Sequence, residues 1–373
     1  MSARRLHLIL APKERFEAAG AGAFALNALE TSLASRWRDH ITIFGTSVAR
    51  PFTAVHFQPL ELARWPLRGR NMAMAHAYAE AVRRELPVLA EVCNRPVMVQ
   101  SLRRQFQSVP LLLHLGNDPR GMDGSRTVVE RQTLLSSTNA IVCVSDFVRR
   151  CFLDGLTGDL AENLHVIHTG VACADAPDTK EKCILFVGRI IREKGVLELV
   201  RALALVLPRH PEWSASIVGA HWFGVGNHPD RFEREVAREA SACSRIALSG
   251  FRPHEEVVAA QRQASIAVVP SKWDDPFPRT ALEALAAGCA LVCSRRGGLP
   301  EIGEERALFL DEVSVGCLEH ALDRLISMDS ERIALQHRGR TDFPFAVART
   351  TRSLDNLRDR LVGRTARAVG IGT

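Results

Sequence analysis

The sequence lacks several features that mark secreted, zinc-binding or membrane-spanning proteins. Its 9 cysteines are an odd number and contain no CxxC pair, which argues against a disulfide framework and favours reduced thiols in a cytosolic protein. No apolar run approaches the roughly 20 residues that cross a bilayer, and the run that ends at Leu10 is too short for a signal peptide. We therefore expect a cytoplasmic protein, with at most peripheral contact at the inner face of the plasma membrane.

The chain also lacks low-complexity segments and short repeats, and its composition is that of an ordinary globular protein. It has 373 residues, 46% of them hydrophobic and 24% charged, so two domains with separate cores are expected. Charge is unevenly distributed, because residues 1–172 contain 20 Lys and Arg against 15 Asp and Glu, and the remainder contains 28 against 27. Most of the net charge of +6 therefore belongs to the first half.

Short apolar runs rich in β-branched residues alternate with segments of helical period along the chain. This alternation is typical of parallel sheets covered by helices on both faces. Strands are predicted at 6–10, 41–44, 54–57, 97–100, 111–115, 140–144 and 164–168, and then at 183–187, 215–218, 246–249, 266–269, 290–293 and 307–310. The predicted fold class is α/β, with two doubly wound Rossmann-like domains facing a cleft. Residues 1–172 would form the first domain, 173–347 the second, and a helix at about 348–373 would pack back on the first.

The segment from Gly20 to Ala25 matches the loose dinucleotide-binding pattern G-x-G-x-x-A. Two features argue against NAD or FAD. The first glycine lies ten residues beyond Leu10, and no carboxylate follows the next predicted strand to hold a ribose. We interpret the segment as a glycine loop that opens a helix, where free N–H groups near Gly22 would meet an anion. A plain helix entry explains it equally well.

Charged and glycine residues follow a buried strand at the start of the second half. Gly188 and Arg189 come directly after the strand, and Lys194 lies at the entry to the next helix. Two cations at a helix N-terminus suit a diphosphate, because the backbone dipole and the side-chain charges agree in sign. A solvated basic turn would contain the same residues, so this motif alone leaves both interpretations open.

A second strand of this half is followed by a loop and a helix with paired carboxylates. A helix that begins near Arg279 places Glu283 one turn inside it, with Asp275 on the preceding loop. The N–H groups of Phe277, Arg279 and Thr280 would then point toward an anion. A glycine pair follows the next strand, at a position where backbone can approach a ligand closely.

Together these motifs resemble the donor half of the family-four retaining glycosyltransferases, which have the two-Rossmann GT-B architecture. That family holds the diphosphate of a nucleotide sugar with a G-R-x4-K-G turn and binds sugar and ribose with an E-x7-E element. A G-G-x-P-E loop, here Gly297 to Glu301, closes its site. The resemblance covers roughly residues 183–310 and continues more weakly at 139–148 and 165–171.

The resemblance implies a role for each matching residue. Arg189 and Lys194 would neutralise charge on the leaving diphosphate, Glu283 would accept from the ribose hydroxyls, and Asp275 would lie near the hydroxyls of the transferred sugar. The other residues expected to bind the donor are Gly22, Gly188, Arg252, Phe277, Pro278, Arg279 and Thr280, with Arg252 in the turn expected to meet the base. Two positions depart from the family pattern: Asp275 replaces a Glu, and Pro278 replaces a Gly, which removes one N–H.

The first half offers one predicted catalytic residue and three weaker candidates on the acceptor side. His114, Asn117 and Asp118 lie at the end of the predicted strand 111–115. The resemblance suggests that a histidine here contacts the donor sugar, whereas a lone histidine on such a strand is as often a satisfied core residue. Asn117, Asp118 and Arg120 would meet the acceptor, and they fit a solvated surface equally well.

The implied activity is transfer of a hexose-type sugar, with retention, from a nucleotide diphosphate sugar to a hydroxyl of a glycan or lipid-linked acceptor. Acceptors in the family are often cell-envelope polysaccharide intermediates. No HExxH, DxD or CxxC…CxxC spacing suits a metal, so neither a metal nor a cofactor other than the donor is expected. Two alternatives remain: a noncatalytic nucleotide-sugar-binding relative, suggested by Asp275 and Pro278, and a nucleotide-sugar epimerase.

The basic first half suggests one further partner. Arg64, Arg68 and Arg70 surround a tryptophan before a predicted amphipathic helix, which suits the headgroup region of an anionic membrane. A solvated loop with a packed tryptophan has the same sequence. Nucleic-acid binding is not expected, because no recognition module accompanies the charge.

Overall fold

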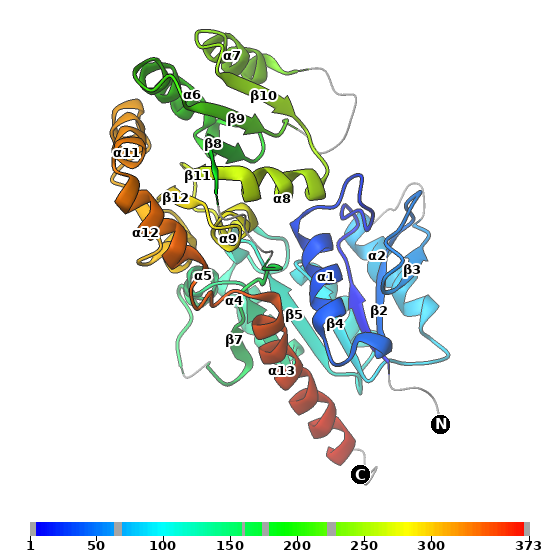
Figure 1. Ribbon diagram of the computed structural model, residues 1–373. Coiled ribbons are helices and arrows are strands. Elements are labelled where there is room, and N and C mark those ends of the chain that lie inside the picture. Colours follow the sequence, from blue (N-terminus) through cyan, green and yellow to red (C-terminus); the bar gives the residue numbers. More distant parts are fainter. Residues whose placement is uncertain (1–4, 63–68, 159–160, 174–178, 222–228, 369–373) are drawn as a thin grey trace. The chain divides into compact units, whose positions relative to one another are not determined.

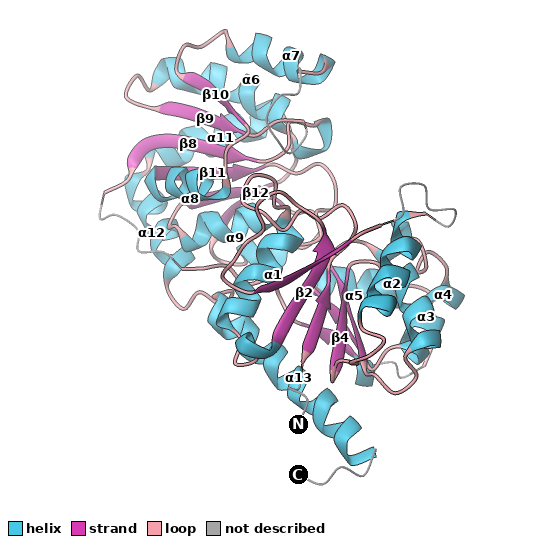
Figure 2. Ribbon diagram, turned by 90° about the vertical axis from the view of Figure 1, so that its right-hand side faces the viewer, coloured by secondary structure: helices cyan, strands magenta, loops and turns pink. Residues whose placement is uncertain are grey.

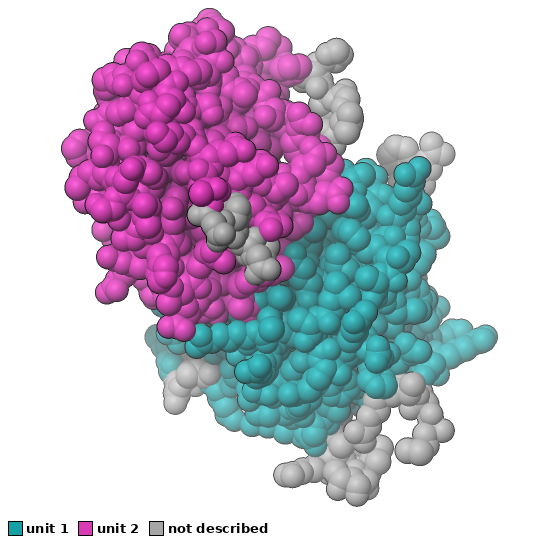
Figure 3. All heavy atoms as spheres, viewed as in Figure 1, with its two compact units in different colours: residues 1–170, 347–373 teal, residues 171–346 magenta. Residues whose placement is uncertain are grey.

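The computed structural model describes residues 5–62, 69–158, 161–173, 179–221 and 229–368. The chain divides into two compact units, residues 1–170 with 347–373 and residues 171–346 (Figure 3). Each unit contains one parallel sheet with helices packed on its faces (Figures 1 and 2). The predicted fold class of two Rossmann-like α/β domains is confirmed.

The first unit is built on a seven-stranded sheet in the order β3-β2-β1-β4-β5-β6-β7. Its strands are β1 (Leu6–Ile9), β2 (Ile41–Thr46), β3 (His56–Leu60), β4 (Leu89–Cys93), β5 (Leu111–Leu115), β6 (Ala140–Cys143) and β7 (Leu164–Val166). All residues of β1 and β4 are buried, as expected at the centre of a parallel sheet covered on both faces. The strand order reverses between these two strands, which is where ligands bind in open α/β sheets.

The helices of the first unit come from both ends of the chain. They are α1 (Ala23–Ala34), α2 (Arg70–Ala81), α3 (Pro96–Gln105), α4 (Val128–Ser137), α5 (Asp146–Leu153) and α13 (Val347–Ala368). On α13, Leu354, Leu357 and Leu361 join the core formed by β1, β2 and α1. Their spacing places them on one face of the helix, so apolar burial holds the last helix on the first unit.

The second unit is built on a six-stranded parallel sheet in the order β10-β9-β8-β11-β12-β13. Its strands are β8 (Glu181–Val187), β9 (Ser214–Val218), β10 (Ile246–Gly250), β11 (Ala264–Val269), β12 (Ala290–Ser294) and β13 (Ala307–Leu310). Its helices are α6 (Val196–Val206), α7 (Arg231–Ala240), α8 (His254–Gln263), α9 (Arg279–Ala286), α10 (Leu299–Gly303), α11 (Val315–Ser327) and α12 (Asp329–Arg340). Every strand predicted in this half is present, because each is an apolar run bounded by turn residues.

One predicted strand of the first half is wrong. Residues 97–100 lie inside helix α3, not in a strand. Pro96 occupies the first turn of α3, where its fixed φ and missing N–H suit a helix start. Met98, Val99 and Leu102 are buried on one face, so the apolar residues follow a helical period instead of a strand period.

The strand missed by sequence reasoning is β4, Leu89–Cys93. It reads Leu-Ala-Glu-Val-Cys, and all five residues are buried, including Glu91. A carboxylate in the middle of a short apolar run hides the strand, because ionised carboxylates are almost never fully buried unless they are paired. The partners of Glu91 come from distant parts of the chain and are described below.

None of the cysteines forms a disulfide, and six of the nine are buried. Burial raises the pKa of the Cys289 thiol to about 11 and also raises the pKa of Cys93. Thiols of this kind stay protonated and pack as small apolar side chains.

Candidate functional site

Most of the predicted donor-binding residues lie on loops that follow strands of the second unit or at the start of helix α9, which the loop after β11 enters. The first of these loops follows β8 and runs through Gly188 and Arg189 into a 3-10 turn, Arg192–Lys194. Gly195 then adopts a left-handed conformation, with φ 68°, at the start of α6. A Cβ at Gly195 would lie 2.1 Å from the carbonyl oxygen of Pro270. The glycine therefore permits the β8 loop to pack against the end of β11.

An ion pair between Lys194 and Asp275 joins the β8 loop to the loop after β11. Both side chains are largely buried, with 18% and 9% of their surfaces exposed. The ammonium group of Lys194 also lies 5.4 Å from the ring centroid of Trp273. The structure thus brings together two residues predicted to be catalytic, and each already neutralises the other. A ligand that uses either charge must share or replace this contact.

Arg189, unlike Lys194, forms no ion pair with a described residue. Its side chain is exposed, and it also forms no hydrogen bond with a residue in the described part of the chain. Its guanidinium group is therefore available to an anion from solution.

Helix α9 begins at Arg279, where the sequence predicts it, and places Glu283 in its second turn. Oε1 of the buried Glu283 accepts hydrogen bonds from Nε of Arg279 at 2.6 Å and from Nε2 of His254 at 2.7 Å. Burial raises the pKa of this carboxyl, but the hydrogen bond from His254 and the charge of Arg279 outweigh burial and lower it. Glu283 is therefore ionised at neutral pH. Its Oε2 forms no hydrogen bond to a described residue, so it is the oxygen left for a ligand.

Sequence reasoning misses His254, which is the first residue of α8 and follows the loop after β10. Its position directly after a strand-following loop is the signal that would have identified it. Arg252, predicted to meet the base, lies two residues earlier and is exposed. Its Nε donates to the carbonyl oxygen of Ser249 at 3.0 Å, so its guanidinium is held beside the end of β10.

The loop after β12 packs its glycine pair against the loop that holds Asp275. The N–H of Gly298 donates to the carbonyl oxygen of Asp275 at 2.8 Å. A Cβ at Gly298 would lie 2.1 Å from the carbonyl oxygen of Pro276. A side chain at this position would push the two loops apart, so the glycine is required for the position of the Asp275 backbone.

The predicted donor residues from Phe277 to Thr280 lead into α9. The first three are buried and Thr280 is half-buried. The ring of Phe277 packs edge-on against Phe345, with 5.4 Å between ring centroids. Pro278 occupies the N-cap position and makes no side-chain cap, so no capping side chain covers the first N–H groups of α9.

In the first unit, His114 lies at the carboxyl end of β5 beside a buried ion pair. Its Nε2 is 2.8 Å from Oε2 of Glu91, and 15% of its side chain is exposed. The oxygens of Glu91 also accept from Nε and Nη2 of Arg358 at 2.7 and 3.0 Å. Both Glu91 and Arg358 are fully buried, and sequence reasoning identified neither. Its only available signal was a carboxylate within an apolar run.

Two of the remaining candidates of the first unit, Asp118 and Arg120, already form ion pairs with nearby side chains. Asp118 caps the turn Pro119–Gly121 and pairs with Arg120 at 2.8 Å, while Arg120 also pairs with Asp154 at 2.9 Å. Asn117 is exposed.

Gly22 occupies the N-cap position of α1 without a side-chain cap. A Cβ there would lie 2.8 Å from Oε2 of Glu14. Burial raises the pKa of the Glu14 carboxyl, although the charge of Arg95 acts in the opposite direction. An acidic group therefore lies next to the position where the sequence predicts contact with an anion.

Comparison with known proteins identifies relatives of the second unit most clearly. Residues 174–342 match the family described as Glycosyl transferases group 1. The chain is 36% identical over 160 residues to a D-inositol 3-phosphate glycosyltransferase of Corynebacterium jeikeium (strain K411), a match that covers 42% of this chain and 38% of the relative. It is 26% identical over 251 residues to spore coat protein SA of Bacillus subtilis (strain 168), covering 61% and 66%. The chain thus matches less than two thirds of the length of either relative.

Two solved structures share the fold over almost the entire chain. Sucrose-phosphate synthase from Thermosynechococcus elongatus superposes with a TM-score of 0.78 at 18% identity, covering 97% of this chain and 100% of that one. HepE of Anabaena, in complex with UDP-glucose, superposes with a TM-score of 0.71 at 16% identity, covering 95% and 99%. The match over residues 174–342 and the shared folds therefore support a glycosyltransferase similar to the group 1 glycosyl transferases, and the fold of the chain is the GT-B architecture that its sequence motifs predicted.

Proposed function

We propose that this protein is a retaining glycosyltransferase that moves a hexose-type sugar from a nucleotide diphosphate sugar to a hydroxyl of a glycan or lipid-linked acceptor. We further propose a role in cell-envelope polysaccharide synthesis. The observation that carries the proposal is the packing of three strand-following loops at one edge of the second sheet, around Lys194 and Asp275. The UDP-glucose complex of HepE and the activity named for the Corynebacterium relative point the same way.

The cations of the β8 loop would act on the leaving diphosphate. Negative charge grows on the diphosphate as the bond to the sugar breaks, and fixed positive charge stabilises that state more than the ground state. Arg189 is free to make this contact. Lys194 would leave Asp275 and bind a phosphate oxygen instead. The released carboxylate of Asp275 would then accept hydrogen bonds from the sugar hydroxyls.

Glu283 would hold the nucleoside part of the donor. Its Oε1 is taken by His254 and Arg279, and its ionised Oε2 would accept hydrogen bonds from the ribose hydroxyls. Because Arg279 lies on the same helix, the carboxylate is oriented before the donor binds, which reduces the cost of ordering it.

Transfer would not depend on a metal ion, because Arg189 and Lys194 supply positive charge for the leaving group. In the described residues, no group of three or more His, Cys, Asp and Glu side chains is arranged to hold a metal. Activity that persists in EDTA supports this part of the proposal. Activity that EDTA abolishes and Mg²⁺ restores would contradict it.

A two-step experiment tests the activity and separates it from the alternatives. Nucleotide diphosphate sugars are first screened by thermal shift, because a ligand of the native state raises the melting temperature. The best donor is then incubated with and without candidate acceptors, and the anomeric configuration of the product is read by NMR. Nucleoside diphosphate release that requires an acceptor supports the transferase. Binding without turnover indicates the noncatalytic relative, and conversion of the donor alone indicates the epimerase.

Peripheral membrane contact and a cytoplasmic location stay predictions. Arg64 and Arg68 lie outside the described residues, and Arg70 is an exposed residue at the start of α2. No helix in the described ranges has the length and apolar character of a membrane span. Flotation with anionic vesicles, weakened by salt and by changing the three arginines to Gln, would support surface binding. Equal partitioning to neutral and anionic vesicles would exclude it.

A further inference from the structure

A row of buried polar contacts connects the last helix of the chain to His114 in the first unit. Arg358 on α13 forms a two-point contact with Glu91 on β4, and Glu91 contacts His114 on β5. Both charged residues are fully buried. A buried ion pair of this kind requires good geometry to offset the loss of hydration, and the two-point contact with Arg358 provides it.

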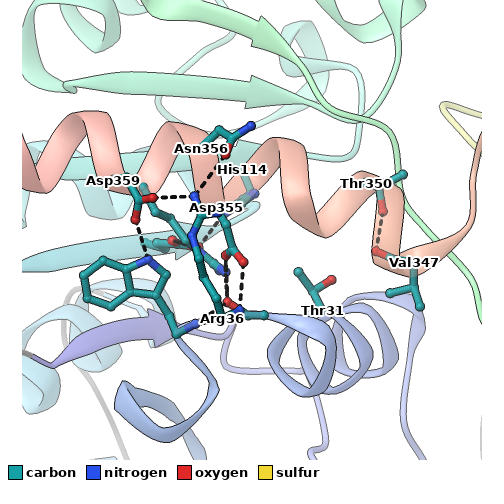
Figure 4. A network of polar contacts seen from close by, with 12 residues as sticks. Thr31, Arg36, His114, Val347, Thr350, Asp355, Asn356 and Asp359 are labelled. Atoms are coloured by element: carbon teal, nitrogen blue, oxygen red, sulfur yellow. Dashed lines mark hydrogen bonds and ion pairs between the residues drawn. The ribbon is translucent and has the colours of Figure 1, made fainter.

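Helix α13 is held in place by a second set of contacts near the surface. Figure 4 shows Arg36, just after α1, reaching Asn356 and Asp359 of α13; the hydrogen bond to Asn356 is 3.0 Å long. Nη1 of Arg358 donates to Asp355 at 3.0 Å, and Asp355 also accepts from the backbone N–H of Arg36 at 2.9 Å. The guanidinium group that faces Glu91 is therefore fixed from both sides.

The charge on Glu91 determines which nitrogen of His114 carries a proton. Burial raises the pKa of the Glu91 carboxyl, but the charge of Arg358 and the hydrogen bond with His114 outweigh burial and lower it to about 2. An ionised carboxylate only accepts hydrogen bonds. Nε2 of His114 must therefore donate, whether the ring is neutral or charged. In the neutral ring the lone pair is then on Nδ1, which forms no hydrogen bond to a described residue.

The backbone on both sides of His114 is also fixed. Its carbonyl oxygen accepts from the N–H of Asn94 at 2.8 Å, and the N–H of Gly116 donates to Oδ1 of Asn94 at 3.1 Å. Asn94 is buried and has a left-handed backbone, with φ 54°, which asparagine tolerates better than most residues. The imidazole is thus held through its backbone and through Nε2.

We propose that Glu91, supported by Arg358, is a positioning residue that keeps His114 in the Nε2–H form and so presents Nδ1 as an acceptor for a hydroxyl of the sugar substrate. The identity of that ligand rests on the proposed function. Helix α13, the last element of the chain, then contributes to the sugar site through Arg358 without touching the sugar itself.

Histidine NMR tests the positioning step without any substrate. In protein labelled with ¹⁵N-histidine, the His114 signals are assigned by their loss in His114→Gln. At a pH where His114 is neutral, we expect the wild type to show Nε2 protonated and Nδ1 unprotonated. Glu91→Gln introduces an amide that donates to Nε2, so part or all of the ring should change to the Nδ1–H form. Asp355→Asn removes a carboxylate partner of the same arginine without touching His114, and should leave the ring in the wild-type form.

Enzyme kinetics test the consequence for the sugar. Glu91→Gln should lower kcat/KM for the donor by about 10- to 100-fold, the range typical for loss of a supporting contact. It should leave binding of the nucleoside diphosphate alone unchanged, because that ligand lacks the transferred sugar. Asp355→Asn should stay close to wild type in both measurements.

Several results would overturn the proposal. They are an unchanged His114 tautomer in Glu91→Gln, an equal change in Asp355→Asn, or a parallel loss of nucleoside diphosphate binding. If Glu91→Gln does not fold, the double change Glu91→Met and Arg358→Met replaces the pair by apolar side chains and leaves Nε2 without its acceptor. The tautomer should then become mixed, and a pure Nε2–H form would refute the proposal. If the wild type transfers no sugar, the proposed function fails, whereas the NMR experiment still tests the positioning step.

Discussion

The two units each contain a buried glutamate that accepts hydrogen bonds from one arginine and one histidine. In the first unit Glu91 contacts Arg358 and His114. In the second unit Glu283 contacts Arg279 and His254. In both cases the histidine lies near the carboxyl ends of the strands of its sheet, and in both cases the contacts lower the pKa of the glutamate.

The two clusters differ in how their parts are joined. Arg279 precedes Glu283 by four residues on one helix, whereas Arg358 is 267 residues away from Glu91. Glu91 is completely buried and uses both oxygens, whereas Glu283 has 7% of its side chain exposed and uses one. The first arrangement suits orientation of a neighbouring group, and the second leaves an oxygen for a ligand. Only the second is visible as a local sequence motif.

The largest expected effect is on stability and follows from loss of Arg358 in the first cluster. Arg358→Met leaves Glu91 buried without its counter-charge, so we expect the free energy of unfolding to fall by about 3–5 kcal/mol. Urea unfolding of the wild type and the variant measures this loss. Adding Glu91→Met should restore much of it, because an apolar pair replaces the ion pair. A loss of only about 0–1 kcal/mol, as for an exposed ion pair, would contradict the role of the buried cluster.

The free cation of the second unit should matter for rate instead of stability. Arg189→Ala should lower kcat by about 10²- to 10³-fold, because it removes a charge that stabilises the leaving diphosphate. The melting temperature should change little, because Arg189 is exposed. Arg262→Ala, at an exposed position on α8, is the matched control. Wild-type turnover in Arg189→Ala would remove this residue from the catalytic group.

Acid should weaken the first cluster over a defined pH range. The pKa of Glu91 is lowered from 4.5 to about 2 in the folded protein, so the unfolded chain binds a proton more readily. The stabilisation is therefore present above about pH 4.5 and is lost as the pH falls toward 2, on the order of 3 kcal/mol in total. Unfolding at pH 6 and pH 3, compared with Glu91→Met and Arg358→Met combined, measures it. An equal acid sensitivity in both proteins would contradict the expectation.

The smallest expected effect concerns the carboxylate that pairs with Lys194. If the shorter arm of Asp275 suits its sugar, Asp275→Glu should lower activity on the native donor by up to about tenfold, which is about 1.4 kcal/mol, or broaden donor choice. Initial rates over a panel of donors measure this. Asp274→Glu, at the exposed neighbouring position, is the control. A clear gain on the native donor would show that Asp275 is a weakened form of the usual site.

Sequence reasoning predicted the second unit better than the first for a physical reason. The strands of the second unit are mostly apolar and contain no fully buried carboxylate, and α9 begins at the predicted Arg279. In the first unit, Glu91 interrupts the apolar run of β4. The apolar residues 97–100 suggest a strand, but they belong to helix α3, which follows β4. The buried carboxylate of Glu91 was enough to hide strand β4 from a prediction based on apolar runs. The free-energy cost of burying it is offset by Arg358 and His114, which are remote from it in sequence.

The sequence by itself determined the fold class, the order of the loops in the second unit and the side chains on them. Local periodicity and the turn residues after each strand encode these features. Only the tertiary structure decided that Lys194 is paired with Asp275 while Arg189 is free, and that His254 orients Glu283. It also decided that Arg358 reaches Glu91 and His114. Such contacts join separate elements, and their energies depend on burial and on distances of about 3 Å, which no local pattern of residues specifies.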